Sequence, residues 1–168
     1  PTEAEWELAA RSGTKNSIWT PNEGGSVPNV NCATSNASIG DGSGSLLEDY
    51  AWFCSNAGNT THPVAQKIPN GYGLFDMHGN VQEWVEDNTY SASFDDASLD
   101  PLTVSTHYAY DYYKGYRGGG YSQSSYYHTV EYRSSTSPTN RYNYLGFRLL
   151  RSMSNSVPLE PLIGLSLA

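Results

Sequence analysis

The chain has 168 residues, a size that suits one domain or most of one. Its formal net charge is −8, and its nine Lys and Arg form no basic cluster, so the average field repels nucleic acid and argues against a nucleic-acid partner. Only 15% of the residues are charged, while Gly, Ser, Thr and Asn are abundant, which favours irregular loops on a scaffold over a helical bundle. The 14 Tyr suit a binding surface, because their rings are apolar and their tips polar.

Residues 2–11 are predicted to form a helix. Thr2 is a suitable N-cap, and Glu5 three residues later completes a capping box. A Ser-Gly pair directly after residue 11 is expected to end the helix. One helix face is apolar at helical spacing, and its members are Trp6, Ala9 and Ala10.

Several short strands are predicted further along the chain. Residues 79–85 read as a strand or bent turn, and residues 116–121 as a strand interrupted by glycines. Residues 145–150 read as a final core strand, whereas residues 18–44 and 87–106 lack periodicity and read as loops. The predicted fold class is therefore α+β with much irregular coil.

The two cysteines are Cys32 and Cys54, and they form neither a CxxC nor a zinc-ligand pattern. Spacing alone leaves two possibilities open, a disulfide or a pair of structural thiols.

Four segments carry a resemblance to a known family. They are residues 1–11 (PTEAEWELAAR), residues 70–84 (NGYGLFDMHGNVQEW), the Arg-Gly-Gly of residues 117–119 and the Leu-Gly-Phe-Arg of residues 145–148. In this order and at these distances they resemble the formylglycine-generating-enzyme (sulfatase-modifying factor) family. The resemblance implies a variant of the C-type lectin fold.

The resemblance also implies a domain organisation. Residues 1–151 correspond to the C-terminal portion of the family domain, and residues 152–168 form a tail. The family domain normally starts well before the PTEAEWE segment. We therefore expect the N-terminal part of the fold to lie outside this sequence, supplied by a second chain or by a longer parent chain.

The family's enzymes oxidise a substrate cysteine to formylglycine, using two active-site cysteines and copper(I), a metal for which thiolates are suitable soft ligands. Those cysteines lie shortly after the Arg-Gly-Gly segment. Here residues 121–129 contain no cysteine, and Gln123 and His128 stand at the expected positions. We expect no catalytic residues, with the oxidase as the less favoured alternative. The four histidines show no ligand spacing, and we expect ordinary surface or loop positions for His62, His78, His107 and His128.

The resemblance implies a calcium site within residues 70–84. The family site uses a side-chain oxygen, two backbone carbonyls and a glutamate, which match Asp76, Gly79, Val81 and Glu83. Ca²⁺ prefers six to eight hard oxygen ligands, often a mixture of carboxylates and carbonyls. The alternative is that Glu83 only pairs locally and that Asp76 is a turn residue.

Tyr, Ser, Thr and Asn crowd residues 108–144. This region resembles the variable region of diversity-generating-retroelement receptor proteins, in which the corresponding positions of the same fold are diversified ligand contacts. Tyr, Ser and Asn suit such a role because they give rigid contact area and adaptable hydrogen bonds. The alternative is that similar residues here are fixed, and that some Tyr are core. The predicted ligand-binding residues are Tyr121, Ser122, Ser124, Tyr126, Tyr127, His128, Tyr142, Asn143 and Tyr144.

These observations predict a non-catalytic binding module, extracellular or displayed on the cell surface, that recognises a protein or glycan ligand on a calcium-stabilised scaffold. The alternative is a structural subunit of a self-assembling surface protein, which would be a homo-oligomer. Residues 156–161 are similar to the start of a bacterial C-terminal sorting tail, which slightly supports export, and the alternative is a disordered or partner-packed terminus. The apolar residues 157–168 are too few to cross a bilayer, which takes about 20 residues.

Overall fold

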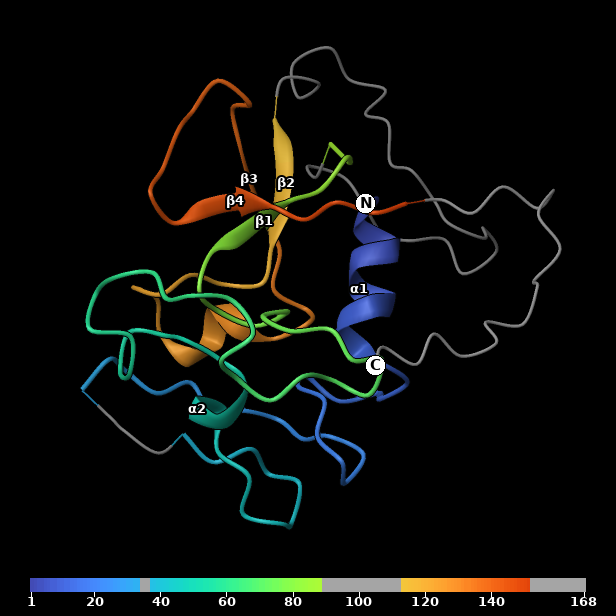
Figure 1. Cartoon of the computed structure of the whole chain (residues 1–168), viewed down its shortest axis with the longest axis vertical. Coiled ribbons are helices and arrows are strands. Elements are labelled where there is room, and N and C mark those ends of the chain that lie inside the picture. Colours follow the sequence, from blue (N-terminus) through green and yellow to red (C-terminus); the bar gives the residue numbers. More distant parts are fainter. Residues whose placement is uncertain (34–36, 89–112, 152–168) are drawn as a thin grey trace, which may run out of the picture.

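The structure is a computed structural model, and it describes residues 1–33, 37–88 and 113–151 (Figure 1). Short elements joined by long loops make up the fold, which confirms the α+β prediction. In Figure 1 the sheet lies in the upper half, α2 in the lower half, and α1 beside the sheet. The elements are α1 (Glu3–Arg11), α2 (Leu47–Tyr50), β1 (Gln82–Trp84), β2 (Lys114–Arg117), the 3-10 helix η1 (Ser125–His128), β3 (Ser134–Thr136) and β4 (Leu145–Phe147). In the part of the chain that is described, no helix has the length and apolarity of a membrane crossing.

The helix α1 forms where its local signals predict it. Thr2 and Glu5 make both bonds of the capping box: the Glu5 amide donates to Thr2 Oγ1 at 3.1 Å, and the Thr2 amide donates to Glu5 Oε2 at 2.8 Å. Ser12 ends the helix in the left-handed conformation with φ 45°. Trp6 and Ala10 are buried, as their shared face predicts.

The sheet has the strand order β3-β2-β1-β4, in which β2 is antiparallel to both β1 and β3, and β1 and β4 are parallel. Trp84 of β1 lies opposite Tyr116 of β2 and Phe147 of β4, so these three aromatic residues share one sheet face. Glu83 pairs with Arg117 one position earlier and therefore projects from the other face, toward α1.

A buried charge network joins α1 to this second face. The Arg117 side chain is fully buried and forms an ion pair with Glu7, and its Nε lies 3.5 Å from Glu3 Oε1. Arg133 Nε approaches the same Glu3 oxygen at 3.4 Å. Burial raises the pKa of Glu3 and lowers that of Arg117, while each opposite charge counteracts the shift. The network therefore links α1 to β2 through Glu3 and Arg117, whose side chains are fully buried, and the partly accessible Glu7 and Arg133 complete it.

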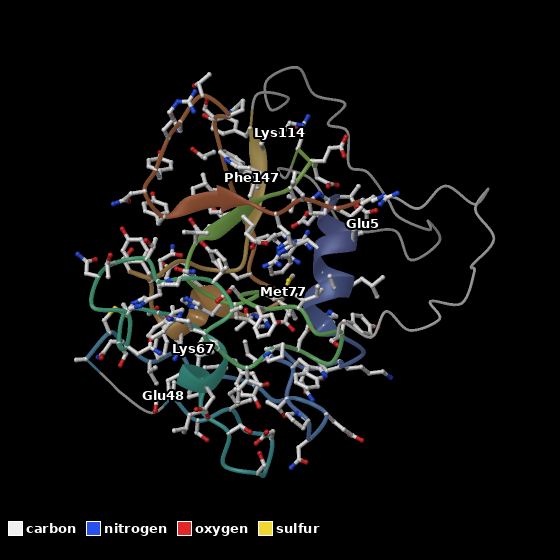
Figure 2. The ribbon with its side chains drawn as sticks, viewed as in Figure 1. Glu5, Glu48, Lys67, Met77, Lys114 and Phe147 are labelled. Atoms are coloured by element: carbon white, nitrogen blue, oxygen red, sulfur yellow. A yellow bond between two sulfur atoms is a disulfide. The ribbon has the colours of Figure 1, made fainter. Side chains whose placement is uncertain are left out.

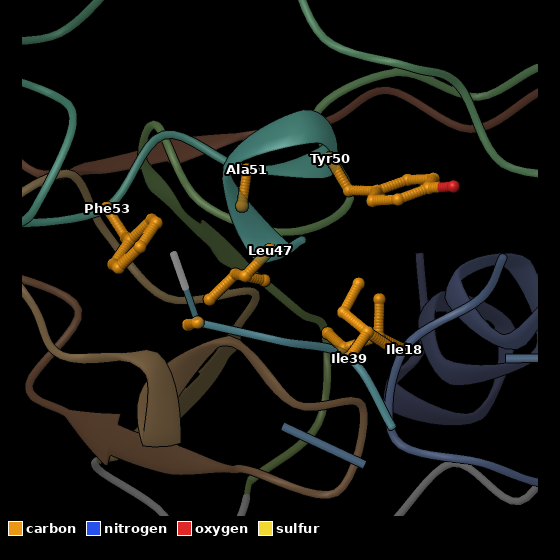
Figure 3. Close-up of a cluster of buried hydrophobic side chains, with 7 residues drawn as sticks. Ile18, Ile39, Leu47, Tyr50, Ala51 and Phe53 are labelled. Carbon is orange, nitrogen blue, oxygen red and sulfur yellow. The ribbon is translucent and has the colours of Figure 1, made fainter. Parts of the chain in front are cut away.

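Two apolar clusters fill the interior. The first surrounds α2 (Figure 3) and consists of Ile18, Ala37, Ile39, Leu47, Tyr50, Ala51 and Phe53. The second lies under α1, where Figure 2 places Met77, and consists of Trp6, Ala10, Met77, Val85 and Val130. Cys54 packs against the first cluster and forms a disulfide with Cys32, which decides between the two possibilities that the sequence left open.

The prediction of a core strand over residues 145–150 is wrong in two respects. The strand covers only Leu145–Phe147, and the side chains that follow it are exposed, with Leu149 86% accessible and Leu150 47%. β4 is an edge strand with β1 as its single partner among the described strands. The strand ends at Phe147, so Leu149 and Leu150 lie beyond the sheet and do not pack on its core face.

Candidate functional site

Aromatic rings gather on the sheet face that lies away from α1. Trp84 and Tyr116 meet edge to face with ring centres 6.2 Å apart. Tyr142 and Tyr144, just before β4, stack at 5.0 Å with their planes 6° apart. A second group comes from η1 and the loop that follows it: Tyr132 contacts the rings of Tyr126 at 5.5 Å and Tyr127 at 4.8 Å.

Tyr116 connects these groups. Burial raises the pKa of Tyr132, and the nearby phenol of Tyr116 raises it further. Burial likewise raises the pKa of Tyr144, with Tyr142 and Tyr116 as further causes. The phenol of Tyr116 thus lies near both groups. We call this surface the tyrosine face, and it consists of Trp84, Tyr116, Tyr126, Tyr127, Tyr132, Tyr142 and Tyr144.

The predicted ligand contacts differ in exposure. Tyr126 is 51% accessible and Tyr142 40%, so both offer their rings to solvent. Ser122 and Asn143 are also exposed, and the half-buried members are Ser124, Tyr127 and Tyr144. Tyr121 and His128 are buried, at 6% and 0% accessibility, so their side chains do not form part of the tyrosine face.

A second candidate site is a pocket of about 440 Å³ beside β4, which we call the acidic pocket. It brings together all four residues predicted to bind calcium, Asp76, Gly79, Val81 and Glu83. Asp76 Oδ2 accepts a hydrogen bond from the Ala65 amide at 2.8 Å, but its Oδ1 is buried and has no partner. The predicted positions therefore line one pocket, which also contains a carboxylate oxygen without a hydrogen-bond partner.

Glu83 in this pocket is already paired. Arg148 donates from Nε to Oε2 at 3.0 Å and from Nη2 to Oε1 at 2.8 Å, and Trp6 Nε1 donates to Oε2 at 2.8 Å. Arg148 Nη2 also reaches the carbonyl oxygens of Phe75 at 2.9 Å and Asp76 at 3.3 Å. The guanidinium therefore neutralises one of the two carboxylates of the pocket.

Comparison with known proteins identifies the family to which this fold belongs. Residues 1–153 match the family described as the sulfatase-modifying factor enzyme 1-like domain (FGE-sulfatase). The chain belongs to this family. It is 34% identical over 167 residues to the formylglycine-generating enzyme of Streptomyces coelicolor, an alignment that covers 88% of this chain and 45% of the relative. It is 39% identical over 85 residues to the chaperone protein LppX of Paenibacillus barcinonensis, covering 50% of this chain and 29% of the relative.

Two solved structures have a fold similar to that of this chain. Treponema denticola variable protein 1 superposes with a TM-score of 0.63 and 35% identity, covering 88% of this chain and 45% of that one. PvdO from Pseudomonas aeruginosa superposes with a TM-score of 0.65 and 25% identity, covering 87% and 49%. The chain spans less than half the length of each of these relatives and structures.

The two positions at which the family resemblance places cysteines are engaged in internal contacts in this FGE-sulfatase domain. Gln123 closes a turn, because its Oε1 accepts from the Gly120 amide at 2.9 Å and its carbonyl accepts from the Cys54 amide at 3.1 Å. His128 is fully buried and donates from Nδ1 to the Ser124 carbonyl at 2.9 Å. Both cysteines of the chain are joined in the Cys32–Cys54 disulfide, so neither is a free thiol.

The prediction that every histidine is a surface or loop residue is wrong for His128, which is buried in η1, whereas His78 lies in a loop as predicted but is also buried. His78 is buried and donates from Nδ1 to the His128 carbonyl at 2.6 Å. Burial lowers the pKa of His78 and of His128 to about 4, so both rings are neutral at pH 7. His62 instead stacks on Trp52 with ring centres 3.7 Å apart, and His107 lies outside the described residues.

The acidic pocket fits a calcium ion in its donor set. Asp76 Oδ1 is an unpaired oxygen, and no hydrogen bond among the described residues ends on the carbonyl oxygens of Gly79 or Val81. The described residues contain no cluster of three His, Cys, Asp or Glu side chains, so a cation here would depend on backbone carbonyls. Such mixed oxygen donors are typical of Ca²⁺. Glu83 is also paired with Arg148, whereas the alternative predicted for it was a local pairing. Its carboxylate has enough lone pairs to accept from Arg148 and to bind a cation as well.

Sequence reasoning missed several residues of the tyrosine face. Trp84, Tyr116 and Tyr132 were not among the predicted ligand contacts, although each contributes a ring. Strand alternation could have suggested that Trp84 and Tyr116 point away from the core, but the pairing register that sets them side by side is a property of the folded sheet.

Proposed function

We propose that this domain is a non-catalytic binding module that uses the tyrosine face to contact a protein or glycan ligand. The carrying observation is three groups of packed rings, two at the sheet and one at η1, in which Tyr126 and Tyr142 are the most exposed. Rings held by one another lose little conformational freedom on binding, so their contact area is available at low entropic cost. The similarity to Treponema denticola variable protein 1, at 35% identity, supports this proposal.

The side chains at the two expected cysteine positions favour binding over oxidation. Gln123 is engaged with Gly120, and His128 is enclosed in the interior. The two thiols that the chain does possess are consumed in a disulfide. With the disulfide intact, the chain offers no thiolate to copper(I), which prefers soft sulfur ligands.

The disulfide also supports an extracellular or surface location. Disulfides form and persist in oxidising compartments and are rare where glutathione keeps thiols reduced. The disulfide joins the loop before α2 to Cys54, whose amide donates a hydrogen bond to the carbonyl of Gln123, two residues before η1. It therefore acts next to the tyrosine face, where its loss would loosen the proposed binding surface.

The binding test compares the loss of an exposed tyrosine from the tyrosine face with the loss of an exposed tyrosine from another surface. Tyr126→Ala and Tyr142→Ala each remove an exposed ring of the tyrosine face, whereas Tyr72→Ala removes a ring that is 58% exposed elsewhere. Wild-type protein is screened on glycan and peptide arrays, and the affinities of its ligands are measured for each variant. We expect about tenfold weaker binding for the two face variants and no change for Tyr72→Ala. Equal affinities in all four proteins would refute the assignment of the surface.

Calcium is the cofactor that the proposal includes. Asp76, Glu83 and the carbonyls of Gly79 and Val81 would hold the ion, which would fix the loop before β1 and so the edge of the sheet. At 100 times its Kd, calcium should raise the free energy of unfolding by about 2.7 kcal/mol.

The calcium test measures this increment by urea denaturation with calcium and with a chelator. Asp76→Ala should abolish the increment, and Glu23→Gln, which removes an exposed carboxylate far along the chain, should preserve it. Comparing increments within each variant separates ion binding from any direct cost of the substitution. An unchanged increment in Asp76→Ala would place calcium elsewhere.

Self-assembly is the second candidate function, and the edge strand favours it. β4 ends the sheet, and its Phe147 is 72% exposed, while Leu149, two residues after the strand, is 86% exposed. An uncovered apolar edge can pair with a second copy. Multi-angle light scattering tests this: a concentration-dependent oligomer that Leu149→Lys returns to monomer would support assembly, and a monomer at all concentrations would exclude it.

A further inference from the structure

The chain is poor in cations, and most of them have internal partners. Six of the nine Lys and Arg hold carboxylates or backbone carbonyls, and these six are Arg11, Lys67, Lys114, Arg117, Arg133 and Arg148. Lys15, Arg141 and Arg151 have no ion pair or hydrogen bond from their side chains within the described part of the chain. Of these three, Arg141 alone borders the tyrosine face.

Arg141 lines a pocket of about 320 Å³ at one end of that face, which we call the Arg141 pocket. Trp84, Tyr142 and Phe147 give it aromatic walls, and Asn140 lies next to Arg141 on its rim. Figure 2 shows Phe147 on the upper part of the sheet, at β4. The cavity therefore combines flat apolar walls with one cation that has no internal partner.

Some hydrogen-bonding groups of the pocket already have partners within the chain. Asn140 Nδ2 donates to Thr136 Oγ1 at 2.8 Å and to the Tyr142 hydroxyl oxygen at 3.1 Å. This use of its amide nitrogen leaves Asn140 Oδ1 as an acceptor, and leaves the hydroxyl hydrogen of Tyr142 as a donor. A complementary ligand needs an anion for Arg141, a hydroxyl that can donate to Asn140, and a flat face for the rings.

We propose that the Arg141 pocket binds a carboxylate-bearing sugar ring, as in the uronic-acid units of an acidic glycan. This inference rests on the proposed binding function and names its ligand class. A guanidinium and a carboxylate form a forked, charge-assisted pair. The sugar hydroxyls supply donors for Asn140, and the C–H face of the ring lies against Trp84 and Tyr142, whose ring faces carry partial negative charge.

Two alternatives fit less well. An Asp or Glu side chain of a peptide would satisfy Arg141 but would bring no flat ring to cover Trp84. A neutral sugar would cover the rings but would leave the guanidinium without a counter-ion. Because the chain carries a net charge of −8, attraction of an anion has to come from this local cation.

The experiment uses two hexasaccharides in calorimetric titrations with the whole chain: one of alternating glucuronate and N-acetylglucosamine, and one of N-acetylglucosamine alone. Arg141→Gln removes the cation and keeps a polar side chain. Lys15→Gln is the matched control, because it removes the same charge from an exposed position that lines a different pocket. We expect Arg141→Gln to weaken the acidic hexasaccharide by about tenfold or more, and Lys15→Gln to leave its affinity within about twofold.

Each outcome supports or overturns the proposal. It is supported if wild type prefers the acidic over the neutral hexasaccharide and Arg141→Gln removes this preference. It is overturned if wild type binds neither sugar, if both charge variants weaken binding equally, or if an acidic peptide competes at Arg141 while the glycan does not bind. If Tyr142→Ala abolishes binding and Arg141→Gln has no effect, the tyrosine face stands as a binding surface and the carboxylate assignment fails.

Discussion

Removal of the disulfide gives the most quantitative test of how this loop-rich fold is held together. Cys32 and Cys54 are separated by 22 positions, so the double replacement Cys32→Ser, Cys54→Ser frees a loop of that length in the unfolded chain. The chain-entropy relation gives roughly 11 cal/mol/K for such a loop, which is about 3 kcal/mol at 25 °C. Because small domains have about 5–15 kcal/mol in total, the loss should be readily measurable.

The assay is urea denaturation followed by tryptophan fluorescence, for wild type with and without reductant and for the double variant. We expect the free energy of unfolding to fall by about 3 kcal/mol on reduction and by a similar amount in the variant. Reductant should not change the double variant, which serves as the internal control. If reduced and oxidised wild type unfold at the same urea concentration, the crosslink does not restrict the unfolded chain and the reasoning is refuted.

Three further perturbations test the interior. His78 and His128 have pKa values of about 4 when folded, below the usual 6.5, so the unfolded chain binds more protons between these values and stability falls as pH drops through this window. Urea denaturation at pH 7 and pH 5 should show a loss of about 1–2 kcal/mol per histidine, and a flat profile would contradict their burial. Gly79→Ala should cost about 3 kcal/mol, since φ is +85° and a Cβ would overlap the Trp52 carbonyl, whereas Gly42→Ala, at φ +75° in open space, should cost about 1 kcal/mol in the same assay. Arg117→Met should lower the melting temperature by an amount equivalent to about 3 kcal/mol, because it strips a counter-ion from buried carboxylates; an unchanged melting temperature would mean that the network adds nothing to stability.

The capping box, a prediction based on neighbouring residues, is confirmed, whereas calcium binding stays a prediction. The capping box needs only Thr2 and Glu5, and the structure contains both of its bonds. The four predicted calcium positions lie within eight consecutive residues, so one tight turn brings them to the same pocket. The left-handed backbone of Asp76 and Gly79, with φ of 54° and 85°, makes that turn.

Predictions that depended on distant pairing could not be made from the sequence. Arg148 binds Glu83 across 65 positions, and nothing local to either residue indicates it. The edge position of β4 is a matter of strand order, which no local pattern of residues indicates. Composition marked the region around Tyr121 and Tyr126 as a surface, but the first ring is buried in the turn that contacts Asn80, and the second is exposed on η1.

The edge strand β4 is where the two candidate sites meet. Phe147 borders both the acidic pocket and the Arg141 pocket, and the next residue, Arg148, holds Glu83. All three residues of β4 pair with β1, and the Arg148–Glu83 ion pair is a further link between β1 and the residue that follows β4. If calcium binds Glu83, it therefore contacts the partner of Arg148, directly after β4, and β4 also forms a wall of the Arg141 pocket. If the two sites are coupled, thermodynamic reciprocity requires that each ligand change the affinity of the other by the same factor.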